Sequence, residues 1–305
     1  MQDPFTVILM THPSAHAAHP DARHVDQAEL LDLDAQVLAE HTASLTAWLP
    51  VAADPRRIVD LGCGTGAGTF ALLARFPEAQ VIAVDSSPDH LRRLAEKAAA
   101  EGVADRVRVV QADLDDGEWP ELGTVDLAWA SASMHHLADP DRALRKVHRM
   151  LAPDGLFAVV ELAGFPRFLP PQAPEDAPGL EDRCHAALEH QHAAHLPHRG
   201  ADWGPMLTAA GFAIAGERTI TVDLPARQHD AIGTYALSTL TRLRNNAGHA
   251  LSAADLRSLD QLLDTSGPRS ILDRGDLALR TTRSVWAATR TRSQSPSQPP
   301  SQSPS

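Results

Sequence analysis

The residues best suited to chemistry form a glycine-rich stretch directly after an apolar segment. Residues 58–66 read Ile-Val-Asp-Leu-Gly-Cys-Gly-Thr-Gly, which predicts a buried strand that runs into a turn. The backbone can turn sharply, and a ligand can approach it closely, at Gly62, Gly64 and Gly66. A loop built for pyrophosphate would avoid a carboxylate, because like charges repel at short range. The presence of Asp60 therefore favours a ligand with an ammonium and a sulfonium, such as S-adenosylmethionine, over a dinucleotide.

A second aspartate follows the next apolar segment. Residues 81–84 (Val-Ile-Ala-Val) predict a buried strand, and Asp85 closes it. An acidic residue about 20 residues after the glycines is placed to accept hydrogen bonds from both hydroxyls of a ribose. Ser86 stands beside this carboxylate, and the following Ser-Pro pair predicts the start of a helix. We therefore expect Asp85 and Ser86 to contact the cofactor.

A third aspartate occupies the same kind of position. Residues 107–112 predict another strand, which ends at Asp113 and Leu114. A carboxylate there could accept a hydrogen bond from the amino group of adenine, while the leucine side chain packs on the ring. Asp113 and Leu114 are thus the candidate adenine-binding residues.

Two adjacent histidines follow the fourth predicted strand. Residues 127–130 form that strand, and the segment after it reads Ser-Ala-Ser-Met-His-His-Leu. Ligands of open α/β sheets bind at the carboxyl ends of the strands, so His135 and His136 are expected near the substrate. A histidine with a pKa near neutrality suits a general base. The other interpretation is that these residues hold the loop or contact the cofactor.

From about residue 55 to residue 165, the chain resembles the class I S-adenosylmethionine-dependent methyltransferases. The matching motifs occur in the order and spacing of that family: VDLGCGTG at 59–66, VIAVDSS at 81–87, QADLDD at 111–116, SASMHHLADPDRAL at 131–144 and LAPDGLFAVVE at 151–161. The resemblance implies an α/β, Rossmann-like fold with a seven-stranded mixed sheet, its last strand antiparallel, with helices on both faces and helical lid insertions. It also implies that Ser131 approaches the methionine part of the cofactor.

The glycine turn alone does not decide the cofactor. Gly62, Gly64 and Ala67 also satisfy the looser dinucleotide-binding pattern with alanine in third place. A dehydrogenase is disfavoured only when the turn is taken together with Asp60, Asp113 and the His-His segment. The combination predicts S-adenosylmethionine as the cofactor.

The sequence predicts one large domain at residues 26–292 between two low-complexity ends. We expect a flexible arm at residues 1–25 and a disordered Ser/Gln/Pro tail at residues 293–305. The predicted parts of the domain are an N-terminal helical lid at 26–54, a cofactor-binding core at 55–165, a substrate and lid region at 166–280, and the last strand at 281–290.

Several roles within this domain stay open. The helices before the first strand either cover the cofactor, as is common in the family, or only pack on the sheet. The helical insertion at 226–279 is either a wall of the substrate cavity or a structural lid. The predicted helix at 180–196 carries His185, His192 and His195 near one face, which could bind a metal or supply a base. Ordinary surface histidines are the simpler interpretation, and no metal site is predicted.

Composition narrows the class of protein. The net charge of −12 argues against non-specific binding to nucleic acid, which needs a basic surface. Cys63 and Cys184 are too few and too distant for a disulfide framework or a zinc site, which favours a reducing cytoplasm. The apolar residues 5–10 are too short to span a membrane, and no basic segment precedes them. We expect a cytoplasmic bacterial protein without membrane or nucleic-acid partners, while the oligomeric state stays open.

The predicted activity is transfer of a methyl group to a small molecule by in-line displacement. Residues 131–134 read Ser-Ala-Ser-Met, so the Asn-Pro-Pro-aromatic or Asp-Pro-Pro-aromatic run used for amino groups of nucleic acids and glutamine is missing. An oxygen, nitrogen or carbon acceptor remains open. The alternative is a protein of the same fold that binds S-adenosylmethionine without catalysis and acts as a regulator or partner.

Overall fold

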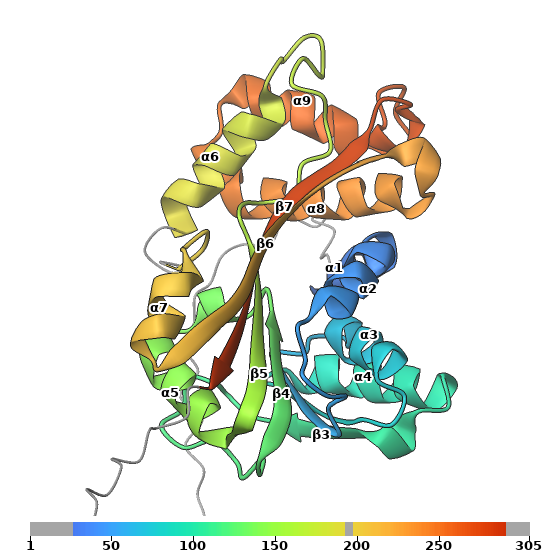
Figure 1. Ribbon diagram of the computed structural model, residues 1–305. Helices are drawn as coiled ribbons and strands as arrows, with labels where there is room; N and C mark the ends of the chain where they lie inside the picture. Colours follow the sequence, from blue (N-terminus) through green and yellow to red (C-terminus); the bar gives the residue numbers. More distant parts are fainter. Residues whose placement is uncertain (1–26, 193–197, 291–305) are drawn as a thin grey trace, which may run out of the picture.

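A computed structural model of the protein describes residues 27–192 and 198–290 (Figure 1). The arm expected at residues 1–25, the tail expected at 293–305 and His195 lie outside the described residues. The described part is an α/β layered structure with a helical region at one end of the sheet, shown at the top of Figure 1.

The central sheet has seven strands in the order β3-β2-β1-β4-β5-β7-β6. Strands β1 to β5 pair in parallel, whereas β7 runs antiparallel to both of its neighbours. The expected fold, including the antiparallel last strand, is therefore confirmed. The strands are β1 (Arg57–Leu61), β2 (Gln80–Asp85), β3 (Val107–Gln111), β4 (Val125–Ser131), β5 (Leu151–Leu162), β6 (Phe212–Pro225) and β7 (Ala278–Arg290).

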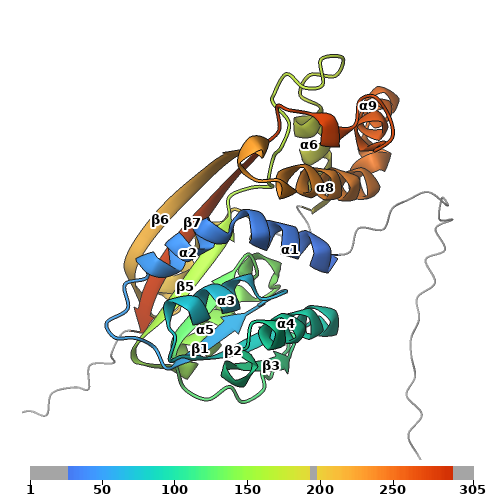
Figure 2. The same ribbon diagram turned by 90° about the vertical axis from the view of Figure 1, so that its right-hand side faces the viewer.

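Helices cover both faces of this sheet (Figures 1 and 2). Apolar side chains of α2, α3 and α4 pack on one face, and those of α5 and α7 pack on the other. Local sequence signals set the helix starts, because Ser87 and Asp139 each cap a helix that has proline in its first turn. The helices are α1 (Gln27–Val37), α2 (Ala39–Trp48), α3 (Ala67–Arg75), α4 (Pro88–Ala100), α5 (Pro140–Met150), α6 (Leu180–His192), α7 (Trp203–Ala209), α8 (Ala231–Ala247) and α9 (Ala253–Leu263).

Five short 3-10 helices lie in the connections of the described chain. They are η1 (Ala104–Arg106), η2 (Met134–His136), η3 (Ala226–Gln228), η4 (Gly248–Ala250) and η5 (Ile271–Asp273). Asp154, inside β5, has a positive φ of 65°. Strand β5 begins at Leu151, which pairs with Val125 before the register shifts.

The β6–β7 hairpin extends beyond the carboxyl edge of the parallel strands. Strand β5 pairs with β7 only along residues 283–289, whereas residues 278–282 of β7 pair with β6 and, at Arg280, with Arg167. The chain between β6 and β7 forms α8 and α9, which pack with α6 above that edge (Figures 1 and 2). We call α6, α8 and α9 the helical cap; it contains the helices expected within the insertion at residues 226–279.

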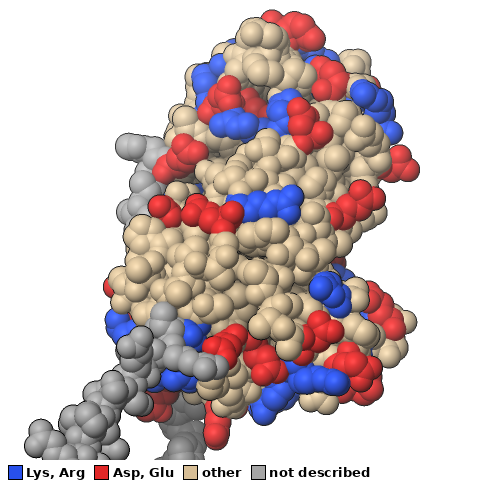
Figure 3. Space-filling model, viewed as in Figure 1, with Lys and Arg blue, Asp and Glu red and all other residues tan. Residues whose placement is uncertain are grey.

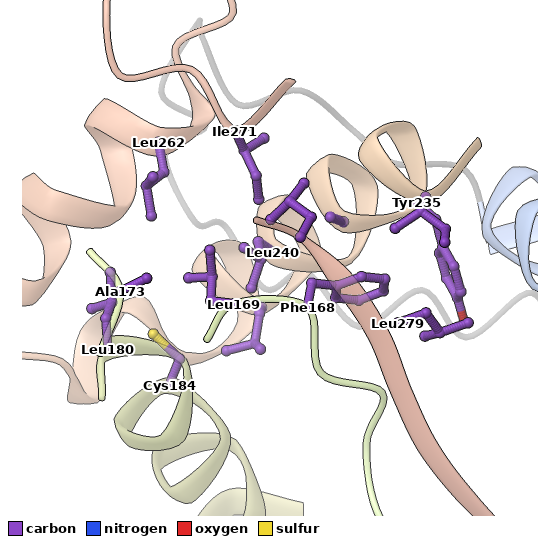
Figure 4. Close-up of a cluster of buried hydrophobic side chains, with 14 of the residues drawn as sticks. Phe168, Leu169, Ala173, Leu180, Cys184, Tyr235, Leu240, Leu262, Ile271 and Leu279 are labelled. Atoms are coloured by element: carbon purple, nitrogen blue, oxygen red, sulfur yellow. The ribbon is translucent and has the colours of Figure 1, made fainter. Parts of the chain in front are cut away.

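The helical cap has a hydrophobic core of its own (Figure 4). Phe168 meets Tyr235 edge to face, with the ring centroids 5.0 Å apart. Val37 and Leu38, at the junction of α1 and α2, belong to the same cluster. The cap is therefore joined to the N-terminal helices as well as to the hairpin.

Charged residues of both signs are mixed on the face seen in Figure 3, and no broad basic area forms there. Among the helices that the structure describes, none combines the length and apolarity needed to cross a membrane.

Candidate functional site

The glycine turn follows β1 at the point where the strand order changes direction. Strand β1 lies between β2 and β4, and crevices at such switch points are where open α/β sheets bind ligands. Gly62, Gly64 and Gly66 have φ angles of 70°, 52° and 101°, which L side chains rarely adopt. A Cβ on Gly62 would lie 2.4 Å from Cβ of Ser133. Both the backbone angles and the space at this turn therefore require glycine.

Asp85 holds the glycine turn together with the start of α4. Its carboxylate accepts hydrogen bonds from the backbone N–H of Gly64 and of Ser87, each at 2.9 Å. The Nδ1 atom of His90 lies 3.2 Å from the same carboxylate. Asp85 is half-buried and Ser86 beside it is exposed. The carboxylate thus stands at the open end of β2, where a ligand in the turn would meet it.

Asp60 lies behind the glycine turn. Its side chain is 1% exposed and accepts a hydrogen bond from Oγ1 of Thr69 on α3 at 2.7 Å. Burial, aided by the charge of Asp85 and opposed by the Thr69 hydrogen bond, raises its pKa to about 7. Strand alternation turns this carboxylate toward the face that α3 covers, and its contact with the cofactor stays a prediction.

The other candidate cofactor residues gather at the same sheet edge. Leu61 is in register with Val84 of β2 and with Ala130 of β4, so these three strands end at one level. Strand β3 ends beside β2 in the same way. The edge therefore brings together the candidate residues after these strands: the glycine turn, Asp85 and Ser86, the exposed Asp113, and the half-buried Leu114 and Ser131.

Helix α1 lies against the glycine turn. The Cδ1 atom of Leu31 would be 3.2 Å from a Cβ placed on Gly64. Asp32 pairs with Arg93 and Lys97 of α4, and Lys97 also donates to the carbonyl of Thr65 at 3.1 Å. The first described helix is thus positioned to close one side of the site.

His135 is buried in a pair with Glu161 of β5. Both side chains are 2% exposed, and Nδ1 of His135 lies 2.6 Å from the carboxylate. Glu161 also accepts hydrogen bonds from the backbone N–H of Met134, at 2.8 Å, and of His135. Burial and this pairing make His135 a residue that shapes the loop after β4. The proposed role as a base does not fit this position.

His136 is exposed, and its ring lies against that of His135 with 4.2 Å between the centroids and a tilt of 38°. Partial desolvation lowers its pKa to about 4, helped by the positive charges of His135, Arg199 and Arg242 and opposed by Glu161. At neutral pH the ring is uncharged. With such a low pKa it is a weak base, because general bases work best near the operating pH.

We expect the imidazole of His136 to stay neutral from pH 8 down to pH 5 and to titrate near its lowered pKa of about 4. This pKa is below the reference value of 6.5, so as the pH falls below 6.5 His136 is protonated in the unfolded chain before it is protonated in the folded protein. The difference should lower the free energy of unfolding. Nitrogen-detected NMR on histidine-labelled protein would follow the ring. A midpoint at 6.5 or higher would contradict the assignment, and Arg199→Met should raise the midpoint.

His185 of α6 does not lie on an exposed polar face. His185 is buried, stacks on Phe165 at 5.3 Å and lies 3.7 Å from Glu181. It is part of the packing because it points from α6 toward the segment after β5. Within residues 27–192 and 198–290, no group of three His, Cys, Asp or Glu side chains has the arrangement of a metal site.

Sequence reasoning missed Glu161 and Arg199. Glu161 was only the last residue of a predicted strand, although its position matches that of the other strand-terminal acids. Arg199 lies in a turn between α6 and α7, with its guanidinium carbon 4.0 Å from the Phe165 ring centroid. No local pattern indicates either contact, because the partners are far apart in the chain.

Comparison with known proteins finds a matching family, relatives of similar sequence and solved structures of similar fold. Residues 59–157 match a family described as a methyltransferase domain. Identity is 37% over 113 residues to a malonyl-[acyl-carrier protein] O-methyltransferase of Laribacter hongkongensis, covering 35% of this chain and 38% of the relative. Sequence identity to a trans-aconitate 2-methyltransferase of Acidovorax sp. JS42 is 41% over 105 residues, which cover 34% of this chain and 38% of the relative.

A demethylmenaquinone methyltransferase of Thermus thermophilus is 35% identical over 131 residues, which cover 43% of this chain and 54% of the relative. The matches thus span between about two fifths and half of these relatives. Two solved structures share the fold: protein BH2331 of Bacillus halodurans C-125 (16% identity, TM-score 0.53) and YcgJ of Bacillus subtilis (17% identity, TM-score 0.50). Each superposition covers 83% of this chain and all of the other chain.

Proposed function

Because residues 59–157 form a class I S-adenosylmethionine-dependent methyltransferase domain, we propose that this protein transfers a methyl group from S-adenosylmethionine to a small-molecule acceptor. The observation that carries the proposal is the meeting of the glycine turn and Asp85 at the switch point of the sheet. Relatives named for malonyl-[acyl-carrier protein] and trans-aconitate support a small acceptor.

The described residues fit S-adenosylmethionine at this edge. Glycines let Ser133 and Leu31 pack closely on the turn, and the methionine part would lie beside the turn, near Ser131. Asp85 would accept the ribose hydroxyls, with Ser86 next to it. Asp113 and Leu114 would receive the adenine. When bound, the cofactor supplies a methyl group that is already electrophilic because it is attached to a sulfonium.

The protein itself must align the acceptor and exclude water. Holding two reactants in the right geometry can supply several kcal/mol of the barrier. Helix α1 lies over the glycine turn on one side, and the helical cap stands above the same edge. Glu161 holds the loop after β4 by its hydrogen bonds to Met134 and His135. These elements would form the acceptor side of the site.

Asp85→Ala should weaken binding of S-adenosylmethionine by about 1–3 kcal/mol, the scale for losing a charged hydrogen-bond acceptor. Titration calorimetry would measure it. Asp126→Ala is a matched control, because this carboxylate also accepts two backbone N–H groups, from Arg56 and Arg57, before β1 at the opposite edge. The control should lose stability but keep cofactor affinity. Unchanged affinity in Asp85→Ala would remove this residue from the site.

Catalysis is tested by formation of S-adenosylhomocysteine with candidate small acceptors. The competing function is a regulatory protein that binds the cofactor without turnover. The described geometry favours it in one respect, since neither His135 nor His136 is placed or poised as an ordinary base. Tight binding with no S-adenosylhomocysteine formed from any acceptor in a bacterial extract would support the regulator and contradict the enzyme.

A further inference from the structure

We propose that the methyl acceptor is a carboxylate, held by Arg199 and Arg242 beside the carboxyl ends of β4 and β5 and converted to its methyl ester. This inference rests on the proposed methyltransferase function and names its substrate class. It is carried by the position of Arg199 beside the end of β5, by the lack of ion-pair partners of both arginines within the described chain, and by the burial of His135 in its pair with Glu161.

Arg199 is held beside the end of β5. Its guanidinium lies over the ring of Phe165, at 4.0 Å from the centroid, and the same ring stacks with His185 at 5.3 Å. A Cβ on the neighbouring Gly200 would be 3.5 Å from the carbonyl of Ala163, which follows β5. Strand β5 pairs with β4 up to Ser131, the residue expected near the methionine part of the cofactor.

Arg242 lies on α8 of the helical cap, which packs with α6, the helix that precedes Arg199 in the chain. Its charge acts on His136 and on Arg199. The three charged or titratable side chains come from the loop after β4, the turn before α7, and the cap.

Neither arginine has an ion-pair partner among the described residues. This contrasts with the surplus of acidic residues in the chain, 39 against 27 basic ones, and with the pairing of other arginines in the cap. Arg244, two positions after Arg242 on α8, contacts Asp260 at 2.9 Å, and Arg183 on α6 contacts Asp255.

The acids nearest to Arg199 do not neutralise it. Glu161 and Glu189 act on it from a distance, but Glu161 is already engaged by His135 and by two backbone N–H groups. The Nε of Arg199 has no hydrogen-bond partner in the described part of the chain. Partial burial lowers the pKa of Arg199, which means that this cation loses hydration without gaining a counter-ion. The pKa of Arg242 is lowered in the same direction, although this residue is exposed on α8. An anionic ligand would supply the counter-ion.

A carboxylate also explains why no base stands in this place. It is ionised at neutral pH, so its oxygen attacks without losing a proton. The oxygen–methyl bond forms as the methyl–sulfur bond breaks, and the electron pair of the broken bond stays on the sulfur. The carboxylate charge and the sulfonium charge cancel, giving an uncharged ester group and an uncharged thioether in S-adenosylhomocysteine. The ester no longer attracts the arginines, which favours its release.

The first experiment identifies the bond that is made. The protein is incubated with methyl-labelled S-adenosylmethionine and the small-molecule fraction of a bacterial extract, and the labelled product is treated with mild alkali. A methyl ester releases its label as volatile methanol, whereas ethers and N- or C-methyl products keep it. Release as methanol is the expected result. An alkali-stable product would overturn the carboxylate but leave the proposed methyltransferase, whereas a lack of any labelled product would count against both.

The second experiment tests the arginines. Arg199→Met and Arg242→Met should each raise the KM for the acceptor about 10- to 100-fold, with a smaller change in kcat and unchanged affinity for S-adenosylmethionine. Arg199→Lys should recover part of the loss, because it keeps the charge. Arg257→Met is the matched control, since this arginine is exposed on α9 of the same cap; it should leave KM unchanged. Equal KM values in all four variants would overturn the assignment.

Direct binding gives a readout that does not depend on turnover. Calorimetry with the protein saturated with S-adenosylhomocysteine would compare succinate, tricarballylate and succinyl-pantetheine with the matching carboxamides. We expect the carboxylates to bind at least tenfold more tightly than the amides, and this preference to disappear in the double variant Arg199→Met/Arg242→Met. Tighter binding of succinyl-pantetheine than of succinate would indicate a carrier-bound acid. The same affinity for acids and amides would contradict the proposal.

Discussion

Gly62→Ala is expected to lower the free energy of unfolding by about 2–5 kcal/mol and to abolish binding of S-adenosylmethionine. The added Cβ would lie 2.4 Å from Cβ of Ser133, a separation that packed carbon atoms do not reach. The residue would also have to keep a φ of 70°, which costs an L residue about 1–2 kcal/mol. Urea unfolding and calorimetric titration with the cofactor would measure the two effects.

Gly102→Ala separates the strain of a positive φ angle from the steric clash with a neighbouring side chain. Gly102 has nearly the same φ, 68°, but no atom lies within 4 Å of a Cβ placed there. This control should therefore lose only the backbone part, about 1–2 kcal/mol, and keep cofactor binding. Ser133→Gly should partly rescue Gly62→Ala by removing the colliding atom. If Gly62→Ala were no more destabilised than Gly102→Ala, close packing at the turn would be excluded as the reason for glycine.

Glu161→Ala is expected to destabilise the protein by about 3–5 kcal/mol and to disrupt the loop after β4. The substitution removes a buried carboxylate that accepts hydrogen bonds from two backbone N–H groups and lies 2.6 Å from Nδ1 of His135. It would leave those donors without a partner away from water, which is the costly way to break a buried pair. Urea unfolding and turnover would report the two consequences.

Glu181 offers a matched comparison in the helical cap. It is also buried, accepts hydrogen bonds from the backbone N–H of Phe168 and Leu169, and lies 3.7 Å from a buried histidine, His185. Glu181→Ala should destabilise to a similar extent yet retain affinity for S-adenosylmethionine. Glu161→Gln should show an intermediate loss, because an amide oxygen can still accept from the backbone. A loss of turnover shared equally by both alanine variants would mean that the effect is general unfolding.

Much of the cofactor half could be predicted from the sequence because its signals are local. The apolar run before Gly62 and the run closed by Asp85 became β1 and β2. The cap at Ser87 sets the start of α4 where expected, and Asp139 caps α5 in the same way. Strand periodicity, glycine turns and helix caps depend on neighbouring residues, so a single sequence contains enough information to place them.

The side-chain environments could not be predicted in the same way. Asp60, a candidate cofactor residue, lies under α3, and His135, a candidate either for the base or for holding the loop, is buried with Glu161. His185 was assigned to a surface face of α6 but packs on Phe165. Each of these outcomes depends on which element covers a residue, and the covering element comes from a distant part of the chain.

The sequence by itself determined the parallel half of the sheet, the glycine turn after β1 and the acidic ends of the neighbouring strands. These follow from backbone preferences and from the alternation of apolar residues, which act over a few positions. Only the tertiary structure decided that Arg199 packs on Phe165 beside the end of β5 and that the charges of Arg199 and Arg242 act on His136, because these residues come from distant parts of the chain. The proposed carboxylate acceptor therefore depends on the tertiary structure and could not be inferred from the sequence alone.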